Sequence, residues 1–153
     1  MNLSESISLV IRRAREDEAQ SIARLYRRTA EHAWDFLCPH TPEEDLAYFT
    51  HALQRGPVWV AAREATILGF CATRRGWIDH FYVAPEEQGR GIGQRLIGQT
   101  LRGRRHVRLW TFQRNARSRA FYAQQGFEVA RMTDGRDNEE REPDVLLEWR
   151  RRP

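Results

Sequence analysis

The sequence predicts an α/β domain built on a mixed, mostly antiparallel sheet that is flanked by helices. Its length of 153 residues suits one compact domain, placed at residues 1–153, and leaves no room for two separate cores. Strand-like and helix-like apolar patterns follow one another along the chain without a strict strand–helix repeat. A glycine-rich segment at residues 88–93 leads directly from a strand-like run into a helix-like one.

The first elements are a short strand and two helices. Residues 7–11 are rich in β-branched side chains, which predicts a strand, and the carboxylates at residues 16–18 suit the positive end of a helix. Apolar residues then recur at three- and four-residue spacing, and this helix should end near Trp34. A second helix is predicted to begin at Thr41, because a capping hydroxyl precedes a proline and a glutamate that can close a capping box.

Three strands should follow this second helix, which Gly56 interrupts. Residues 58–62 and 67–72 are β-rich runs joined by a tight polar connection around Glu64, and they predict a hairpin. Residues 77–83 form a third run that is rich in aromatic and β-branched side chains. This third strand ends immediately before the glycine-rich segment.

The rest of the chain alternates helices and strands. The predicted elements are a helix at 92–101, a strand at 107–112, a helix between Asn115 and Gly126, and strands at 127–132 and 145–149. Residues 134–144 are polar and show no periodicity, so they predict a long loop of the kind that carries function.

Composition excludes several classes of enzyme. All 25 cationic side chains are arginine, since the sequence contains no lysine, and this excludes Schiff-base catalysis and the lysine of a nucleoside-triphosphate loop. The net charge is only +4, and 21 carboxylates are mixed among the arginines. The basic run at residues 102–108 lacks interleaved aromatic residues, so we expect no nucleic-acid partner.

Cysteine usage and hydropathy indicate a cytoplasmic protein. Cys38 and Cys71 have no CxxC spacing and are expected to be reduced thiols, and no His–Cys cluster predicts a metal site. No apolar run reaches the roughly 18 to 20 residues that a membrane span needs. Residues 1–6 lack the basic and apolar blocks of a secretory signal. We therefore expect no membrane partner.

The glycine-rich segment is typical of an anion-binding loop. Gly89, Gly91 and Gly93 let the backbone approach a ligand closely and direct free N–H groups at it. The alternative is a tight turn packed against the sheet, but the order of strand, glycines and helix favours phosphate. The dinucleotide fingerprint fails, because Gln94 and Leu96 stand where its last glycine is required.

Two blocks of this sequence resemble the GCN5-related N-acetyltransferase (GNAT) superfamily. Residues 82–93, YVAPEEQGRGIG, resemble its acetyl-coenzyme A signature. Residues 115–127, NARSRAFYAQQGF, resemble its later block, in which an asparagine opens a helix and a tyrosine precedes a Gly-Phe pair. The order of the other elements also resembles the family, which implies a sheet splayed around the cofactor.

The resemblance implies a set of residues that bind acetyl-CoA as co-substrate, without a metal. Backbone groups of Phe81, Tyr82 and Val83 would pair with the pantetheine arm as an added strand does. The residues that would wrap the pyrophosphate are Gln88, Gly89, Arg90, Gly91, Ile92, Gly93 and Gln94. Asn115 and Ser118 would line the far side of the arm.

The resemblance also implies that Tyr122 is the general acid for the departing thiolate. The base is chosen between Asp79 and His80, which strand alternation should send to opposite faces, so that only one faces the substrate. We favour Asp79, because its parity matches Phe81 and because a carboxylate can bind a cationic amine or relay its proton. Glu139 and Glu140 are further candidate bases, and His80 can equally be a histidine packed under a helix.

The predicted function is transfer of the acetyl group of acetyl-CoA to a primary amine by direct attack. Carboxylates crowd residues 139–144 and open the second helix at residues 43–45, so we expect a small cationic amine or a basic N-terminus as acceptor. Two alternatives stay open. One is a non-catalytic acetyl-CoA sensor, against which Tyr122 argues, and the other is a protein N-terminal acetyltransferase. Family members are often dimers, so a homodimer is compatible with the resemblance.

Overall fold

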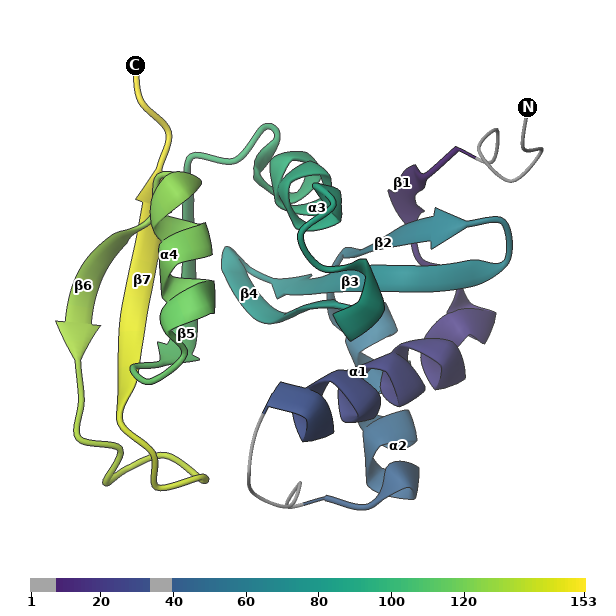
Figure 1. Ribbon diagram of the computed structural model, residues 1–153, viewed down its shortest axis with the longest axis horizontal. Helices are drawn as coiled ribbons and strands as arrows, with labels where there is room; N and C mark the ends of the chain where they lie inside the picture. The colour runs from purple at the N-terminus through teal and green to yellow at the C-terminus, as the bar shows by residue number, and fades with distance from the viewer. Residues whose placement is uncertain (1–7, 34–39) are drawn as a thin grey trace.

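The computed structural model describes residues 8–33 and 40–153 and contains one seven-stranded sheet with four α-helices around it (Figure 1). The strands are β1 (Val10–Arg13), β2 (Val58–Arg63), β3 (Thr66–Arg74), β4 (Trp77–Val83), β5 (His106–Phe112), β6 (Glu128–Met132) and β7 (Asp144–Arg150). The helices are α1 (Ala19–Ala33), α2 (Pro42–Arg55), α3 (Ile92–Leu101) and α4 (Ala116–Gln124), with short 3-10 helices η2 (Glu16–Glu18) and η3 (Pro85–Glu87).

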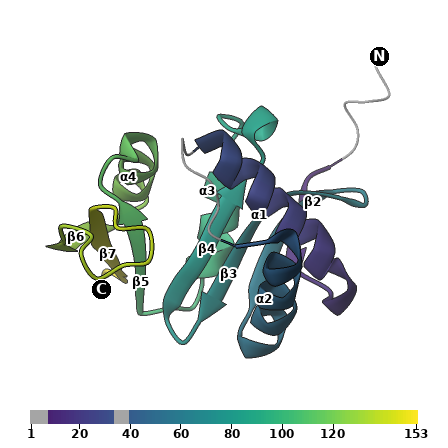
Figure 2. The ribbon, with the colours of Figure 1, turned by 90° about the horizontal axis from the view of Figure 1, so that it is seen from below.

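The sheet has the order β1-β2-β3-β4-β5-β7-β6, and every neighbouring pair is antiparallel except β4 and β5. The parallel pair β4–β5 joins only two residues of each strand, Trp77 to Arg108 and Ile78 to Leu109. The two strands then separate, and the sheet divides into β1–β4 and β5–β7–β6 (Figures 1 and 2). The predicted mixed, mostly antiparallel and splayed sheet is therefore confirmed.

The helices cover the two parts of the sheet differently. Helices α1 and α2 pack on one face of β2–β4, where Ile22 and Phe49 meet Val60 and Phe70. Helix α3 packs on the opposite face and contacts Cys71, a free and buried thiol. Helix α4 lies on one face of β5–β7–β6, and no described helix lies on the other (Figure 2). Cys38 lies outside the described residues.

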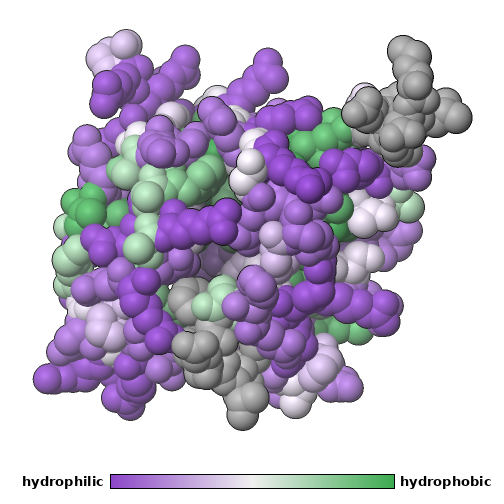
Figure 3. Space-filling model, viewed as in Figure 1, coloured by the Kyte–Doolittle hydropathy of each residue, from purple (hydrophilic) through white to green (hydrophobic). Residues whose placement is uncertain are grey.

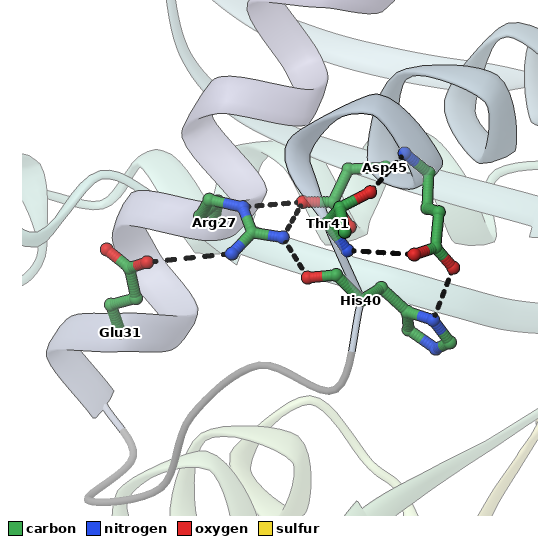
Figure 4. Close-up of polar contacts among 6 residues, drawn as sticks. Arg27, Glu31, His40, Thr41 and Asp45 are labelled. Atoms are coloured by element: carbon green, nitrogen blue, oxygen red, sulfur yellow. Dashed lines mark hydrogen bonds and ion pairs between the residues drawn. The ribbon is translucent and has the colours of Figure 1, made fainter.

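The start of α2 has the predicted capping box. The Thr41 hydroxyl accepts a hydrogen bond from the Glu44 amide at 3.1 Å, and Glu44 Oε1 accepts one from the Thr41 amide at 3.2 Å. Arg27 of α1 fixes this end of α2 through an ion pair of 2.7 Å with the buried Asp45 and a hydrogen bond to the His40 carbonyl (Figure 4). The start of α2 is thus tied to α1.

The first strand differs from its predicted range of residues 7–11. It begins at Val10 and continues through Arg12 and Arg13, which pair with Val60 and Trp59 of β2. Arginines can occupy this strand because β1 is an edge strand and because Arg12 donates a hydrogen bond to Glu18. The predicted end of the first helix near Trp34 lies outside the described residues. No helix in the described part of the chain is long and apolar enough to cross a membrane.

Candidate active site

The separation of β4 from β5 leaves one edge of β4 without a strand partner. Its other edge stays paired with β3 as far as Val83, which pairs with Gly69. Beyond Ile78, the edge that faces β5 has no partner among the described strands. Backbone N–H and C=O groups at such an edge can pair with the amides of an extended ligand. Phe81, Tyr82 and Val83 lie on this stretch, as the predicted pairing with pantetheine requires.

A cleft of about 820 Å³ opens at the point where β4 and β5 separate. Helix α1 and β4 form one wall, and β5, β6 and the loop between β6 and β7 form the other. Figure 3 shows that hydrophilic residues predominate on the face of the molecule seen there. The residues that line the cleft are Tyr26, Ala30, Asp79, His80, Tyr82, Trp110, Thr111, Phe112, Arg131, Met132, Thr133, Asp134, Asp137, Asn138, Glu140 and Asp144.

Asp79 and His80 both line this cleft, so the prediction that only one of them would face it is wrong. The reason is a β-bulge. Ala72 of β3 pairs with His80, and the next residue, Thr73, pairs with Ile78. Asp79 is thus an extra residue on β4, and a bulge breaks the strict alternation of side chains on which the prediction relied.

Asp79 and His80 have different surroundings. Asp79 forms an ion pair of 3.2 Å with Arg74. His80 Nε2 lies 3.1 Å from the Tyr48 hydroxyl, and its ring packs near the rings of Tyr26 and Phe49 at 5.4 and 5.2 Å. Burial lowers the pKa of His80 to about 4, so the imidazole is neutral at pH 7. Asp79 is therefore the better group for binding a cation.

The glycine-rich segment forms an open loop at the start of α3. Gly89 and Gly91 have φ angles of +80° and +82°, which glycine adopts without strain. Gly91 is the N-cap of α3 and provides no side chain, so the first amides of the helix stay available to an anion. A Cβ atom at Gly91 would meet no protein atom within 4 Å, which leaves room for a ligand.

Neighbouring side chains support this loop. Gln88 Nε2 donates a hydrogen bond to the Val83 carbonyl at 3.0 Å and so ties the loop to the end of β4. The buried carboxylate of Glu87 contacts Arg90 at 3.4 Å and Arg63 at 3.2 Å. Ile92 is buried in the core. The ordered positions of these residues suit the wrapping of a diphosphate.

Gly93 and Gln94 occupy the first turn of α3. A Cβ atom at Gly93 would lie 3.4 Å from the ring of Phe121, so this glycine permits close packing of α3 and α4. Gln94 is exposed and so can meet a ligand. The glycines therefore have two functions, since Gly89 and Gly91 open the loop and Gly93 admits a neighbouring helix.

Asn115 is the N-cap of α4, and its Oδ1 accepts a hydrogen bond from the Ser118 amide at 3.1 Å. Both residues are partly exposed at the start of α4. The capping bond explains the asparagine locally, and neither residue lines the cleft described above. Their predicted contact with the pantetheine arm remains a prediction.

Tyr122 lies on α4 and is 6% exposed. Its ring is enclosed by aromatic neighbours, with centroid distances of 5.9 Å to Phe81 and 5.5 Å to both Phe121 and Phe127. No described residue accepts a hydrogen bond from its hydroxyl in this structure. Burial raises the pKa of the phenol, so Tyr122 keeps its proton at neutral pH.

The predicted site residues thus occupy two sides of β4. Phe81 stacks on Phe121 of α4 at 5.5 Å, on the side that carries Tyr122 and the glycine loop. His80 and Tyr82 face α1 and α2 on the other side, where the cleft lies. This geometry suits a cofactor on the α3–α4 side and an acceptor in the cleft.

Only some of the carboxylates that were expected to attract a cationic acceptor, at residues 139–144 and 43–45, line the cleft. Glu140 and Asp144 line it, whereas Glu139 lies 3.0 Å from His40 and Glu142 lies 3.1 Å from Arg114. At residues 43–45, Glu44 belongs to the capping box and Asp45 pairs with Arg27, so this group is not part of the lining. The carboxylates at residues 43–45 therefore make no contribution to this cleft.

Sequence reasoning missed Trp110, which lines the cleft from β5. A signal was present, because alternation along residues 107–112 places Val107 and Leu109 in the core and Trp110 on the opposite face. A large apolar side chain on an outward face marks a contact surface.

The comparisons with known proteins agree with this geometry. A family model described as an acetyltransferase (GNAT) domain matches residues 54–129. An uncharacterized N-acetyltransferase of Archaeoglobus fulgidus is 31% identical over 134 residues, which covers 75% of this chain and 90% of that protein. The chain belongs to the GNAT acetyltransferase family. This GNAT chain is an acetyl-CoA-dependent N-acetyltransferase.

Other relatives have more specific names. The peptidyl-lysine N-acetyltransferase YjaB of Salmonella typhimurium is 27% identical over 120 residues, or 78% of this acetyltransferase and 83% of that protein. The solution structure of apo YjaB from Escherichia coli has a TM-score of 0.74 at 23% identity and covers 93% of this chain and 97% of that one. The structure of yncA from Salmonella typhimurium with acetyl-CoA has a TM-score of 0.74 at 20% identity and covers 94% of each chain.

The residues of this acetyltransferase fit acetyl-CoA. The free edge of β4 suits the amides of pantetheine, and the open N-terminus of α3 suits a diphosphate. Arg90 adds a cation beside the loop.

Proposed function

We propose that this GNAT acetyltransferase acetylates a cationic primary amine that enters the cleft beside Asp79. One observation carries the proposal, namely that five carboxylates line the cleft and Arg131 is the single cation among the lining residues described. The carboxylates belong to Asp79, Asp134, Asp137, Glu140 and Asp144. A cleft lined by charge of one sign raises the local concentration of a ligand of opposite sign.

The five carboxylates differ in their contacts, since Asp79 pairs with Arg74 at 3.2 Å and Asp134 with Arg136 at 3.7 Å. Asp137 and Glu140 have no ion-pair partner among the described residues, so their charges face the cleft uncompensated. Asp144 is held by the Thr133 hydroxyl and by Asn138, both neutral groups. YjaB is named a peptidyl-lysine N-acetyltransferase, and the lysine side chain is an amine of the proposed kind.

Acetyl-CoA supplies a thioester whose carbonyl carbon forms a bond to the amine nitrogen while its bond to sulfur breaks. The incoming ammonium loses one proton before the attack, and the nitrogen loses a second as the amide forms. The departing sulfur gains one proton, so that one proton is released overall. We assign the binding of the incoming ammonium to Asp79, which lies at the point where β4 and β5 separate. Because this attraction raises the pKa of the ammonium, Asp79 must also take its proton or pass it to water before the nitrogen attacks.

We assign the proton for the departing sulfur to Tyr122. The phenol is protonated at neutral pH, because burial raises its pKa, and its ring packs on Phe81 beside the free edge of β4. The loop at residues 88–94 and the backbone at residues 81–83 would hold the coenzyme so that its thioester lies between Tyr122 and Asp79. Asn115 and Ser118 would contact the pantetheine arm.

An acceptor screen that follows the release of free thiol from acetyl-CoA tests this proposal. The acceptors are a lysine peptide with a blocked N-terminus, a basic peptide with a free N-terminus and no lysine, an alkyl diamine, a neutral hydroxylamine-type amine and an amine that carries a phosphate. We expect release with cationic acceptors and little with the anionic one. Asp79→Asn should lower kcat/KM for the cationic acceptors. A screen whose best acceptor is anionic would contradict the proposal.

A further inference from the structure

The entrance to the space between β4 and β5 is flanked by one carboxylate and one indole. The last parallel pair of the two strands is Ile78 and Leu109. Asp79 on β4 and Trp110 on β5 are therefore the first residues beyond it, and both line the cleft. An amine that binds Asp79 at this point has Trp110 as its neighbour on the opposite strand.

Trp110 is placed to contact a ligand. Its side chain is 42% exposed, whereas Leu109 beside it is 2% exposed on the other face of the sheet. Other tryptophans have partners within the chain, since Arg13 lies 5.6 Å from the ring of Trp59 and Arg108 lies 4.5 Å from that of Trp77. Among the described residues, Trp110 has no aromatic or guanidinium partner. An exposed indole in a cleft offers apolar surface to whatever enters.

We propose that Trp110 selects acceptors whose reacting amine is carried on an unbranched apolar arm, over the α-amine of a peptide N-terminus. The inference rests on the proposed function, since it assumes that the ammonium binds Asp79. The atoms next to the nitrogen then lie against the indole. In an alkyl arm these atoms are methylenes, which gain by leaving water. In an α-amine only the Cα atom separates the nitrogen from a peptide group, which loses hydrogen bonds to water on the same surface.

The charge of the cleft is complementary to this occupant. A cationic head with an apolar arm matches Asp79 beside an indole, and the carboxylates of Asp137 and Glu140 farther along disfavour an anionic arm. A methylene that is fully removed from water contributes about 0.8 kcal/mol, or about fourfold in affinity. Contact on one side should give about twofold to fourfold for each methylene.

The test measures kcat/KM for the full chain with primary n-alkylamines from propyl to hexyl, a lysine peptide with a blocked N-terminus, and a peptide with a free N-terminus and no lysine. We expect kcat/KM of the wild type to rise about twofold to fourfold per added methylene, and the lysine arm to be preferred to the N-terminus. The alkylamines and the lysine peptide distinguish a free amine from a protein side chain as the source of the arm.

Three variants assign the effect to Trp110. Trp110→Ala and Trp110→Gln should flatten the dependence on chain length and leave the KM for acetyl-CoA unchanged, whereas Trp110→Phe should keep most of it. Val129→Ala is the matched control, because Val129 is 54% exposed on β6 and lies outside the cleft. This variant should retain the wild-type dependence.

Several outcomes would overturn the inference. A flat wild-type series does so without any variant, and so does an equal slope in the wild type and Trp110→Gln, or a preference for the N-terminus. Release of thiol with cationic amines but no chain-length effect leaves the proposed function standing and removes only the role of Trp110. No release with any cationic amine removes both.

Discussion

Tyr122 combines two properties that a proton donor in this reaction needs. Its ring is fixed by Phe81, Phe121 and Phe127, and its phenol is protonated because burial raises the pKa. Fixed position lowers the entropy cost of proton transfer. The same burial makes the phenol a weak acid, so its proton should move only toward a sulfur that is already departing.

The variant Tyr122→Phe removes the phenolic oxygen and keeps the ring. We expect turnover to fall by about 10² to 10⁴-fold, the usual contribution of a general acid, and the affinity for acetyl-CoA to stay within about twofold, since the ring contacts persist. Steady-state kinetics and calorimetry measure the two quantities. A fall in turnover of less than about tenfold would show that Tyr122 is not the acid or that protonation does not limit the rate.

At the residue scale, the position of a side chain is hard to predict from the sequence where it depends on how two strands pair. Asp79 was chosen because its parity matches Phe81, but Asp79 lines the cleft whereas Phe81 packs on Phe121 of α4. The expected alternation of Asp79 and His80 failed, because the bulge at Asp79 arises from the register between β3 and β4, which the sequence of β4 alone does not contain. His80 packs under α1 and α2, as its alternative interpretation expected. Trp110 was missed because its position in the cleft depends on the point at which β5 separates from β4.

At the scale of elements, the shape of the loop before α3 is set by its backbone conformation and not by side-chain contacts at Gly91. Gly91 has a φ of +82°, and a Cβ there would meet no protein atom within 4 Å. A substitution should therefore act through strain in the loop and through a side chain that stands over the helix amides. A side chain at Gly91 would not clash with the rest of the protein.

The variant Gly91→Val should weaken coenzyme A binding by at least about tenfold, since a β-branched residue in this conformation costs on the order of 1–3 kcal/mol. Gly98→Ala is the matched control within α3, because its Cβ also meets nothing within 4 Å and its φ is not positive. This control should keep the affinity and stabilise the helix by about 0.5–1 kcal/mol. Unchanged affinity in a folded Gly91→Val protein, measured by calorimetry, would refute the assigned binding loop.

The contribution of the 3-10 helix η2 to stability depends on pH. Glu18 at the end of η2 has an 8% exposed side chain and accepts hydrogen bonds from Arg12 of β1 at 2.7 and 2.9 Å. The hydrogen bonds from Arg12, with that from the Arg15 amide, lower the pKa of Glu18 to about 2. The contribution to stability is complete above the unfolded pKa near 4.5 and is lost as the pH falls toward 2.

Glu18→Gln should therefore lower the free energy of unfolding at pH 7 by roughly 2–3 kcal/mol. The difference from the wild type should shrink as the pH falls from about 5 to 2. Urea unfolding at several pH values measures it, with Glu16→Gln, an exposed neighbour in the same 3-10 helix, as the control. A difference that does not change with pH would show that the Arg12 contact is not electrostatic.

The elements themselves could be predicted where their signals are adjacent in the sequence. The start of α2 followed from Thr41, Pro42 and Glu44, whose capping interactions lie within one turn. The limits of β1 did not follow, because Arg12 and Arg13 enter the strand only through pairing with β2. A strand boundary is a property of two segments, whereas a helix cap is a property of one.

At the scale of the whole molecule, one parallel pair of strands organises the site. Strands β4 and β5 meet at two residue pairs and then separate, which leaves one edge of β4 without a strand partner and opens the cleft. The resemblance to the family predicted roles for the glycine loop and Tyr122, and these roles remain predictions. The set of cleft carboxylates could not be predicted from the sequence, because Glu140 and Glu139 are neighbours in sequence and only Glu140 faces the cleft.

The binding of a cationic acceptor in this cleft is tested most directly by the KM for that acceptor. We would measure it at low and high salt in the double variant Asp137→Arg/Glu140→Arg. Arginine avoids a new acetylatable amine. We expect the acceptor KM to rise on the order of threefold to tenfold at low salt and to return nearly to the wild-type value at high salt, with an unchanged KM for acetyl-CoA. Glu16→Arg/Glu128→Arg, which makes the same change in net charge outside the cleft, should leave the acceptor KM near the wild-type value. An acceptor KM that does not change at low salt in the cleft variant, or that rises equally in the control, would contradict the account.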